Sequence, residues 1–240
     1  TGELVSMEAL ARWQKSDGTF VSPEEFIPLF ESSGFITRFD MYIWKSVCKT
    51  LAAWQDKGCK LVPISINVSM IDITNIDVPQ YLSMLTEQYH ISPEYLPVEI
   101  TESVFAESNT IVKNTITRFH KKGFYVLMDD FGSGYSSLNV LKDANVDYLK
   151  LDMKFMQIDA KNKGKGIQIL KSIVDMAYRL GLVIIAEGVE TKEQSEILKS
   201  MNCNYGQGFY FHRPMSVEAA EELIQTIPIE NFRAAHEQVS

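Results

Sequence analysis

The chain alternates between short apolar runs and longer amphipathic stretches from one end to the other. The apolar runs are rich in β-branched residues and lie at 4–12, 61–69, 96–103, 124–130, 147–152, 182–190 and 205–211. Most of them lack strict alternation of polar and apolar residues, as expected for parallel strands that are buried on both faces. Because helices fit between these strands along one unbroken chain, the pattern predicts a parallel α/β fold.

The stretches between the runs carry helix signals. Ser22 with Glu25, and proline at the first helical position, predicts a capping box. An apolar stripe at helical spacing crosses 38–57, and Thr191 with Gln194 predicts a second capping box. No linker separates these units, and 240 residues is an ordinary length for one α/β barrel domain.

A (β/α) barrel needs eight strands, whereas seven runs are found. The first run begins at residue 4, so we expect the first barrel strand to be missing from this chain. An open doubly wound sheet is the competing fold, but no GxGxxG motif follows a first strand to support it.

Nearly every run has a polar or ionisable residue near its carboxyl end. In a barrel these ends meet at one opening, the barrel mouth, where the active site lies. Glu8, Leu10 and Arg12 share one face of the first run, and the other runs contribute Asn67, Glu99, Glu102, Asp129, Asp130, Lys150, Asp152, Glu187, Glu190 and Gln207. A single strand-end carboxylate is more often a cap or a surface ion pair, an interpretation that stays open for Glu102 and Glu190. Recurrence on six strands favours a shared site.

The acids at the proposed mouth need positive charge, because isolated buried carboxylates are costly and close pairs repel each other. Lys150 and Arg12 supply two positive charges. They face six acids, which are Glu8, Glu99, Asp129, Asp130, Asp152 and Glu187. Six minus two leaves four negative charges, the charge of two divalent cations. An oxygen-rich set with one asparagine selects Mg²⁺ or Mn²⁺, and the dispersed histidines and cysteines argue against zinc.

The overall charge of −8 argues against a general binder of duplex DNA, which needs basic patches. No apolar run of about 18 residues predicts a membrane span, and the first residues do not resemble a signal peptide. Three cysteines without a CxxC motif suit a reducing compartment. We therefore expect a cytoplasmic domain, with any membrane anchor confined to upstream segments.

The motifs resemble the EAL domain family, the cyclic di-GMP phosphodiesterases of bacterial signalling. The signature Glu8-Ala9-Leu10-Ala11-Arg12 is followed in family order by INVS, EITES, DDFGSGYSSL, LKLD, AEGVET and QGFYFHRP. The resemblance implies a modified TIM (β/α)8 barrel in which one strand is antiparallel. It also implies metal-dependent hydrolysis of cyclic di-GMP to the linear dinucleotide pGpG.

The same resemblance implies a role for each motif residue. The ligands of a first ion would be Glu8, Asn67, Glu99 and Asp129. A second ion or its water network would use Asp130, Asp152 and Glu187. Lys150 and Glu187 would position or activate the attacking water. The substrate would contact Leu10, Arg12, Asp40 and Gln207. Glu102 and Glu190 would support loops, Glu102 by anchoring the DDFGSG segment.

We expect residues 1–240 to form a single EAL-type barrel domain, truncated at its N-terminus and cut from a longer multidomain protein. The rest of that protein would hold sensory or GGDEF-type (diguanylate-cyclase-like) regions, and the domain would form a homodimer. Two ions are expected rather than one. The main alternative is a non-catalytic cyclic di-GMP receptor. Another TIM-barrel metal enzyme, such as an enolase-like one, has only fold analogy in its favour.

Overall fold

The computed structural model describes residues 2–106, 110–132, 141, 144–153, 163–230 and 232. Seven strands form one curled sheet in the order β1-β4-β5-β6-β7-β8-β9, and each neighbouring pair is parallel. They are β1 (Met7–Glu8), β4 (Ile64–Asn67), β5 (Val98–Thr101), β6 (Val126–Phe131), β7 (Tyr148–Asp152), β8 (Val183–Glu187) and β9 (Tyr205–Gly206). Each strand overlaps one of the seven predicted runs, which confirms the α/β class.

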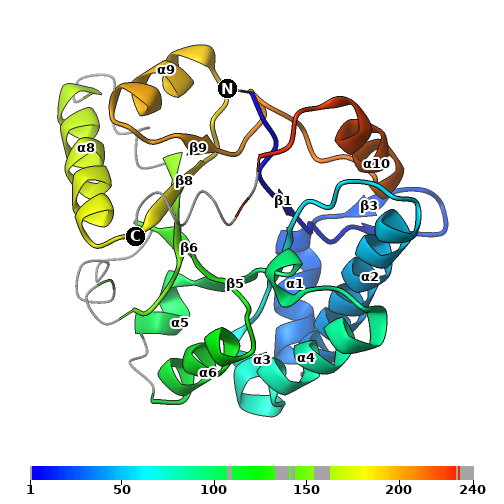
Figure 1. The fold of residues 1–240 in the computed structure, drawn as a ribbon. Helices are drawn as coiled ribbons and strands as arrows, with labels where there is room; N and C mark the ends of the chain where they lie inside the picture. Colours follow the sequence, from blue (N-terminus) through cyan, green and yellow to red (C-terminus); the bar gives the residue numbers. More distant parts are fainter. Residues whose placement is uncertain are drawn as a thin grey trace.

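Helices surround the strands (Figure 1). They are α1 (Pro23–Ser32), α2 (Ile36–Asp56), α3 (Met70–Asn75), α4 (Val78–Tyr89), α5 (Glu102–Ala106), α6 (Thr110–Lys121), α8 (Lys163–Arg179), α9 (Lys192–Ser200) and α10 (Val217–Thr226), with a 3₁₀ turn η1 (Pro93–Tyr95). The outward-facing strand residues pack with these helices in the main core. None of the helices in the described ranges has the length and apolar character that a bilayer span requires.

The inward face of the sheet has two layers. The lower layer is apolar and consists of Leu127, Tyr148, Val183 and Ile185, packed with Phe232. Two residues further along β6, β7 and β8 stand Asp129, Lys150 and Glu187. Residues two apart share one face of a strand, so these three lie on the same inward face. The barrel interior is therefore apolar toward the amino ends of the strands and ionisable at their carboxyl ends.

The sheet begins at β1 and ends at β9, and a cavity of about 1470 Å³ is lined by residues of both. Ile229 and Phe232, near the C-terminus, lie beside the amino ends of the strands. Ile229 forms a parallel bridge with Leu4, and the Phe232 ring stacks on Tyr148 at 4.4 Å between centroids. All seven strands of this sheet are parallel in the described residues. The antiparallel barrel strand is not among them and stays a prediction.

The two predicted helix starts differ in detail. Thr191 forms the capping box with Gln194, as predicted. Ser22 is the N-cap residue of α1, but its side chain makes no capping hydrogen bond, so that prediction is wrong. The Glu25 N–H donates to the Ser22 carbonyl at 3.0 Å, so the backbone satisfies the donor that the side chain would have capped.

A small hairpin follows the EAL signature and was not predicted. Its strands are β2 (Trp13–Gln14) and β3 (Phe20–Val21), which pair antiparallel. Trp13 packs against Phe26 and Phe30 of α1, with ring centroids 5.8 and 5.5 Å away. The hairpin therefore ties the segment after the signature to the first helix.

Candidate active site

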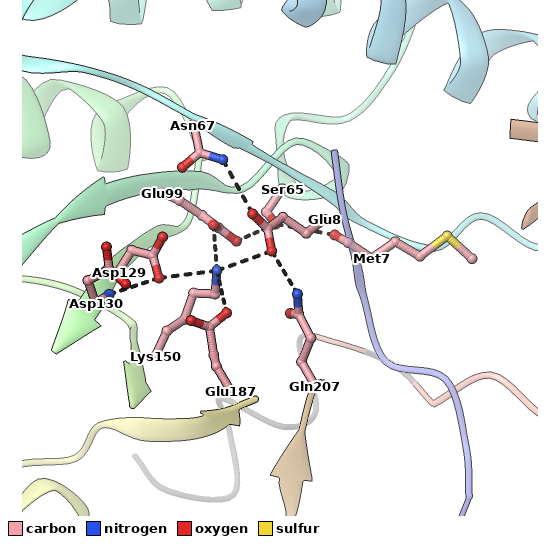
Figure 2. Close-up of polar contacts among 10 residues, drawn as sticks. All are labelled: Met7, Glu8, Ser65, Asn67, Glu99, Asp129, Asp130, Lys150, Glu187 and Gln207. Carbon is pink, nitrogen blue, oxygen red and sulfur yellow. Dashed lines mark hydrogen bonds and ion pairs between the residues drawn. The ribbon is translucent and has the colours of Figure 1, made fainter. Parts of the chain in front are cut away.

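The carboxyl ends of the strands bring the predicted residues together at the barrel mouth (Figure 2). Glu8 comes from β1, Asn67 from β4 and Glu99 from β5. The remaining members of the group are Asp129 and Asp130 on β6, Lys150 and Asp152 on β7, Glu187 on β8 and Gln207 after β9. A parallel sheet places these strand ends side by side, which is why residues up to 199 positions apart in the chain make contact.

Lys150 lies at the centre of the site and is buried. Its Nζ is 2.6 Å from Glu99 Oε2 and 2.7 Å from Glu187 Oε1. It is also 3.3 Å from Asp129 Oδ1 and 3.5 Å from Glu8 Oε2. One ammonium thus faces four carboxylates from four different strands.

Burial and crowding shift the pKa values of this group. Desolvation, with repulsion from Glu8 and Asp129, raises the pKa of Glu99 to about 7, although Lys150 opposes the shift. Desolvation likewise raises the pKa of Glu187 to about 8. Burial alone would lower the pKa of Lys150, but the surrounding carboxylates hold it well above its ordinary value. The site therefore contains more negative charge than its single lysine neutralises.

Glu8 is oriented by two amides on opposite edges of the mouth. Gln207 Nε2 donates to Glu8 Oε2 at 2.7 Å, and Asn67 Nδ2 lies 3.4 Å from Glu8 Oε1. Gln207 is held by a close backbone approach at its neighbour Gly208. A Cβ at Gly208 would lie 2.3 Å from the Val189 carbonyl oxygen, so only glycine fits there.

Asp129 and Asp130 are consecutive, and a regular strand would point them to opposite faces. The β6–β7 register shifts between Met128 and Phe131, and Asp130 has a φ of 57° in the left-handed region. This irregularity turns both acids toward the mouth, where single oxygens of Asp129, Asp130 and Glu187 lie within 4.8 Å of one another. The Asp130 N–H also donates to Asp129 Oδ1 at 2.9 Å.

Ser65 is a site residue that sequence reasoning missed. Its Oγ lies 2.5 Å from Glu99 Oε1 and 3.2 Å from the Met7 carbonyl oxygen, and its side chain is buried (Figure 2). It stands two residues before Asn67 on the same face of β4. That spacing was the one available signal.

The other acids lie at the rim of the site. Glu102 is buried, and its Oε2 accepts from the N–H of Gly132, the first glycine of the DDFGSG segment, at 2.9 Å. Asp152 is half-buried and opposite Glu187 in the β7–β8 register. Glu190 is exposed, and its backbone N–H bonds to the Gln194 side chain. Residues 133–138 of the DDFGSGYSSL motif lie outside the described residues.

The predicted substrate residues separate into two groups. Leu10, Arg12 and Gln207 line the cavity, and the Arg12 guanidinium donates to the Ala11 carbonyl at 2.9 Å. Asp40 of α2 is not among the cavity-lining residues. Its carboxyl faces Asp72, and desolvation with repulsion from Asp72 raises the pKa of Asp40 to about 8.

The donor chemistry fits a hard divalent cation. The side chains at the mouth present carboxylate and amide oxygens, the ligands that Mg²⁺ and Mn²⁺ prefer. In the described residues, the cluster with metal-ligand spacing is Asp129, Asp130 and Glu187, all carboxylates. The fold and the site together define a barrel protein with a candidate metal centre at the carboxyl ends of its strands.

Comparisons with known proteins identify the family. The EAL domain model matches residues 1–214. The probable cyclic di-GMP phosphodiesterase PdeB of Escherichia coli (strain K12) is 35% identical over 218 residues, or 90% of this chain and 41% of that protein. The cyclic di-GMP phosphodiesterase PdeR of the same organism is 34% identical over 222 residues, or 92% of this chain and 33% of that protein.

Among solved structures, the PaMucR phosphodiesterase in complex with c-di-GMP has a TM-score of 0.80 and 30% sequence identity, and the match covers 90% of this chain and 87% of that one. The chain belongs to the EAL domain family, and its barrel fold class is confirmed. It spans less than half the length of the two curated relatives.

Proposed function

We propose that this domain hydrolyses one phosphodiester bond of cyclic di-GMP and releases linear pGpG, with Mg²⁺ or Mn²⁺ as cofactor. The observation that carries the proposal is the set of four carboxylates around buried Lys150 at the mouth of a barrel. An acidic site of this kind suits a phosphodiester only when cations are bound with it. The similarity to PdeB and PdeR, which are named as cyclic di-GMP phosphodiesterases, supports the same substrate.

The proposed ligands of one ion are Glu8, Asn67, Glu99 and Asp129. Those of a second ion, or of its water network, are Asp130, Asp152 and Glu187. Bound divalent ions would lower the pKa of water and stabilise the charge that develops on the phosphate. The short separation of the Asp129, Asp130 and Glu187 oxygens supports placing an ion beside Asp129.

We propose that two side chains act on the attacking water. Lys150 and Glu187 are in contact at 2.7 Å, and Glu187 also lines the cavity. We assign to Lys150 the orientation of the water, since an ammonium donates hydrogen bonds and accepts none. Glu187 is assigned the acceptance of its proton.

The substrate would lie in the cavity that contains Leu10, Arg12 and Gln207 on its wall. Arg12 would contact a phosphate or a guanine edge, and Leu10 would pack on the ligand. Gln207 would contact the ligand next to Glu8. Asp40 as a guanine contact stays a prediction, because the structure turns its carboxyl to Asp72.

The assembly around the domain is also proposed from its relatives. PdeB is longer than this chain, which covers 41% of it. We infer an upstream sensory or GGDEF-type region and a homodimer of the full-length protein. Glu102 and Glu190 would support the segments that follow β6 and β8.

Incubation with cyclic di-GMP tests the proposal. We expect pGpG on anion-exchange chromatography with Mg²⁺ or Mn²⁺, and none with EDTA. Ca²⁺ should occupy the oxygen ligands but support little turnover, because its coordination is looser. Tight binding of cyclic di-GMP without any pGpG would favour the receptor alternative and contradict the enzyme assignment.

A further inference from the structure

Helix α2 reaches the candidate metal site through one side chain. The indole N–H of Trp44 donates to the carbonyl oxygen of Asn67, with 3.0 Å between Nε1 and O. Trp44 is fully buried in α2, whereas Asn67 is the last residue of β4 and its side chain is at the mouth. The bond therefore links the core of a helix to a residue of the site.

The position of β1 explains why this carbonyl needs a side-chain donor. The Met7 N–H donates to the Pro63 carbonyl at 2.9 Å. Two residues further along each strand, the Ala9 N–H donates to the Ser65 carbonyl at 2.9 Å. The next carbonyl on this edge of β4 is that of Asn67, but the β1–β4 register has already ended with Ser65. The donor there comes from α2 instead of β1.

The peptide group after Asn67 is held on both sides as a result. Its N–H, on Val68, donates to the Glu99 carbonyl of β5 at 2.9 Å, and its C=O accepts from Trp44. A peptide fixed at both ends cannot rotate about the strand axis. The direction of the Asn67 side chain is thereby set, with its amide 3.4 Å from Glu8 Oε1.

The same helix holds the turn that follows. Asp40 lies one helical turn before Trp44 and its carboxyl contacts Asp72. Asp72 in turn accepts from the Ser69 N–H at 2.9 Å and from Ser69 Oγ at 2.7 Å, which caps α3. Trp44 and Asp40, on one face of α2, therefore face the two ends of the segment from Asn67 to Asp72.

A second tryptophan shows that burial in α2 does not itself require such a bond. Trp54 is as buried as Trp44, yet in the described part of the chain its indole nitrogen has no hydrogen-bond partner. The two residues are matched in helix, size and burial. They differ in the bond to Asn67.

We propose that Trp44 is a positioning residue, which fixes Asn67 in the orientation needed to bind the divalent cation. The inference rests on the proposed function, because that function makes Asn67 a metal ligand. Loss of the N–H would leave the Asn67 carbonyl without its donor and free the peptide to rotate. The expected consequence is weaker metal binding in a protein that still folds.

Titration of the metal-free protein with Mn²⁺, followed by calorimetry, tests the inference without any substrate. Trp44→Phe should raise the Mn²⁺ dissociation constant roughly 10-fold, the effect typical of residues that orient a ligand. Trp54→Phe, the matched control, should leave it within about 2-fold of the unsubstituted value, since it loses no bond to the site. Equal changes in the two variants would overturn the inference.

A double-variant cycle separates positioning from general damage to the fold. In an Asn67→Ala background, Trp44→Phe should cause no further loss of Mn²⁺ affinity. A full additional loss in that background would contradict the inference, because Trp44 would then act elsewhere. If Trp44→Phe does not fold, the tryptophan analogue with sulfur in place of the indole N–H can be placed at position 44, with the same expected loss.

The Mn²⁺ titration and the cyclic di-GMP assay test the role of Trp44 and the proposed function independently. Formation of pGpG with equal Mn²⁺ affinities for Trp44→Phe and Trp54→Phe would reject the role of Trp44 and leave the enzyme. Selective loss of Mn²⁺ affinity in Trp44→Phe without any pGpG from the unsubstituted protein would reject the enzyme and leave the role of Trp44.

Discussion

Lys150 and Glu99 form a buried ion pair inside the barrel, with 2.6 Å between Nζ and Oε2 and side chains that are 2% and 1% exposed. A pair this deep gains little net stability, because the desolvation of both charges offsets their attraction. Three further carboxylates surround the same ammonium. The arrangement therefore supports the proposed cation-binding, catalytic role better than a role in stabilising the fold.

Removal of Lys150 should destabilise the fold, because the carboxylates around it would lose their ammonium partner. Lys150→Met leaves the neighbouring carboxylates unpaired, so we expect the free energy of unfolding without divalent ions to fall by about 3–5 kcal/mol. Urea unfolding with and without Mg²⁺ measures the effect, and Mg²⁺ should recover more stability in Lys150→Met than in the unsubstituted protein. Lys57→Met is the control, because Lys57 is exposed and its ion pair with Glu221 is screened by solvent, so its loss should be much smaller than that of Lys150→Met. Equal losses in both variants would refute the account.

Ser65 should stabilise the fold as the hydrogen-bond donor to Glu99. Ser65→Ala leaves a buried carboxylate oxygen without its hydroxyl partner, which costs about 1–3 kcal/mol of stability. Thermal and urea unfolding measure the loss. Ser172→Ala, at an exposed helical position in α8, should change stability by less than about 0.5 kcal/mol. A Ser65→Ala protein as stable as that control would show that the bond to Glu99 is dispensable.

The strand ends were predictable because apolar runs in a parallel α/β chain mark both the strands and their order. The same pattern predicts that Glu8, Asn67, Glu99 and Lys150 meet at one mouth. Regular alternation could not predict how both Asp129 and Asp130 face inward, because the left-handed backbone at Asp130 is a local irregularity.

Other features could not be predicted from sequence patterns, for different reasons. Ser65 is a small polar residue within an apolar run, and its role depends on its hydrogen bond to Glu99, 34 positions away. Asp40 was interpreted as a substrate contact, which stays a prediction, and no local pattern indicated that its carboxyl faces Asp72. The hairpin of β2 and β3 did have a local signal, since Asp17-Gly18 is a turn dipeptide, with Gly18 at a φ of 86°.

Glycine at position 208 should be essential for the backbone next to Gln207. In Gly208→Ala the new Cβ would collide with the backbone of Val189 at a φ of 150°, so we expect a loss of about 2 kcal/mol or more. The control is Gly164→Ala, at an exposed position of α8 with open space around its Cβ, which should be neutral or stabilising by up to about 1 kcal/mol. Unfolding curves that do not separate the two variants would count against the close approach at Gly208.

Asp40 should make stability depend on pH. Its pKa is about 8 in the folded chain and 3.8 in the reference state, so between these values the folded protein binds more protons than the unfolded one. The free energy of unfolding then falls as pH rises through this window, by at most about 1.4 kcal/mol per pH unit from this group. Below about pH 4 the contribution of the raised pKa is fully present.

Asp40→Asn removes that titration and keeps a donor for Asp72. We expect its melting temperature to exceed that of the unsubstituted protein by more at pH 8 than at pH 5. Differential scanning calorimetry at both pH values provides the comparison. The assignment fails if the difference between the two proteins is the same at pH 5 and pH 8.

The proposed function requires the carboxylates at the barrel mouth, together with divalent cations, to hydrolyse cyclic di-GMP. The most direct measurement is the rate of pGpG formation with Mg²⁺ for the unsubstituted protein and for Glu8→Ala, alongside the melting temperature of each. We expect pGpG from the unsubstituted protein. In a folded Glu8→Ala variant the rate of pGpG formation should fall by at least about 100-fold, since a proposed metal ligand at the reacting centre is removed. Similar rates in the two proteins, or no pGpG from either, would contradict the proposed function.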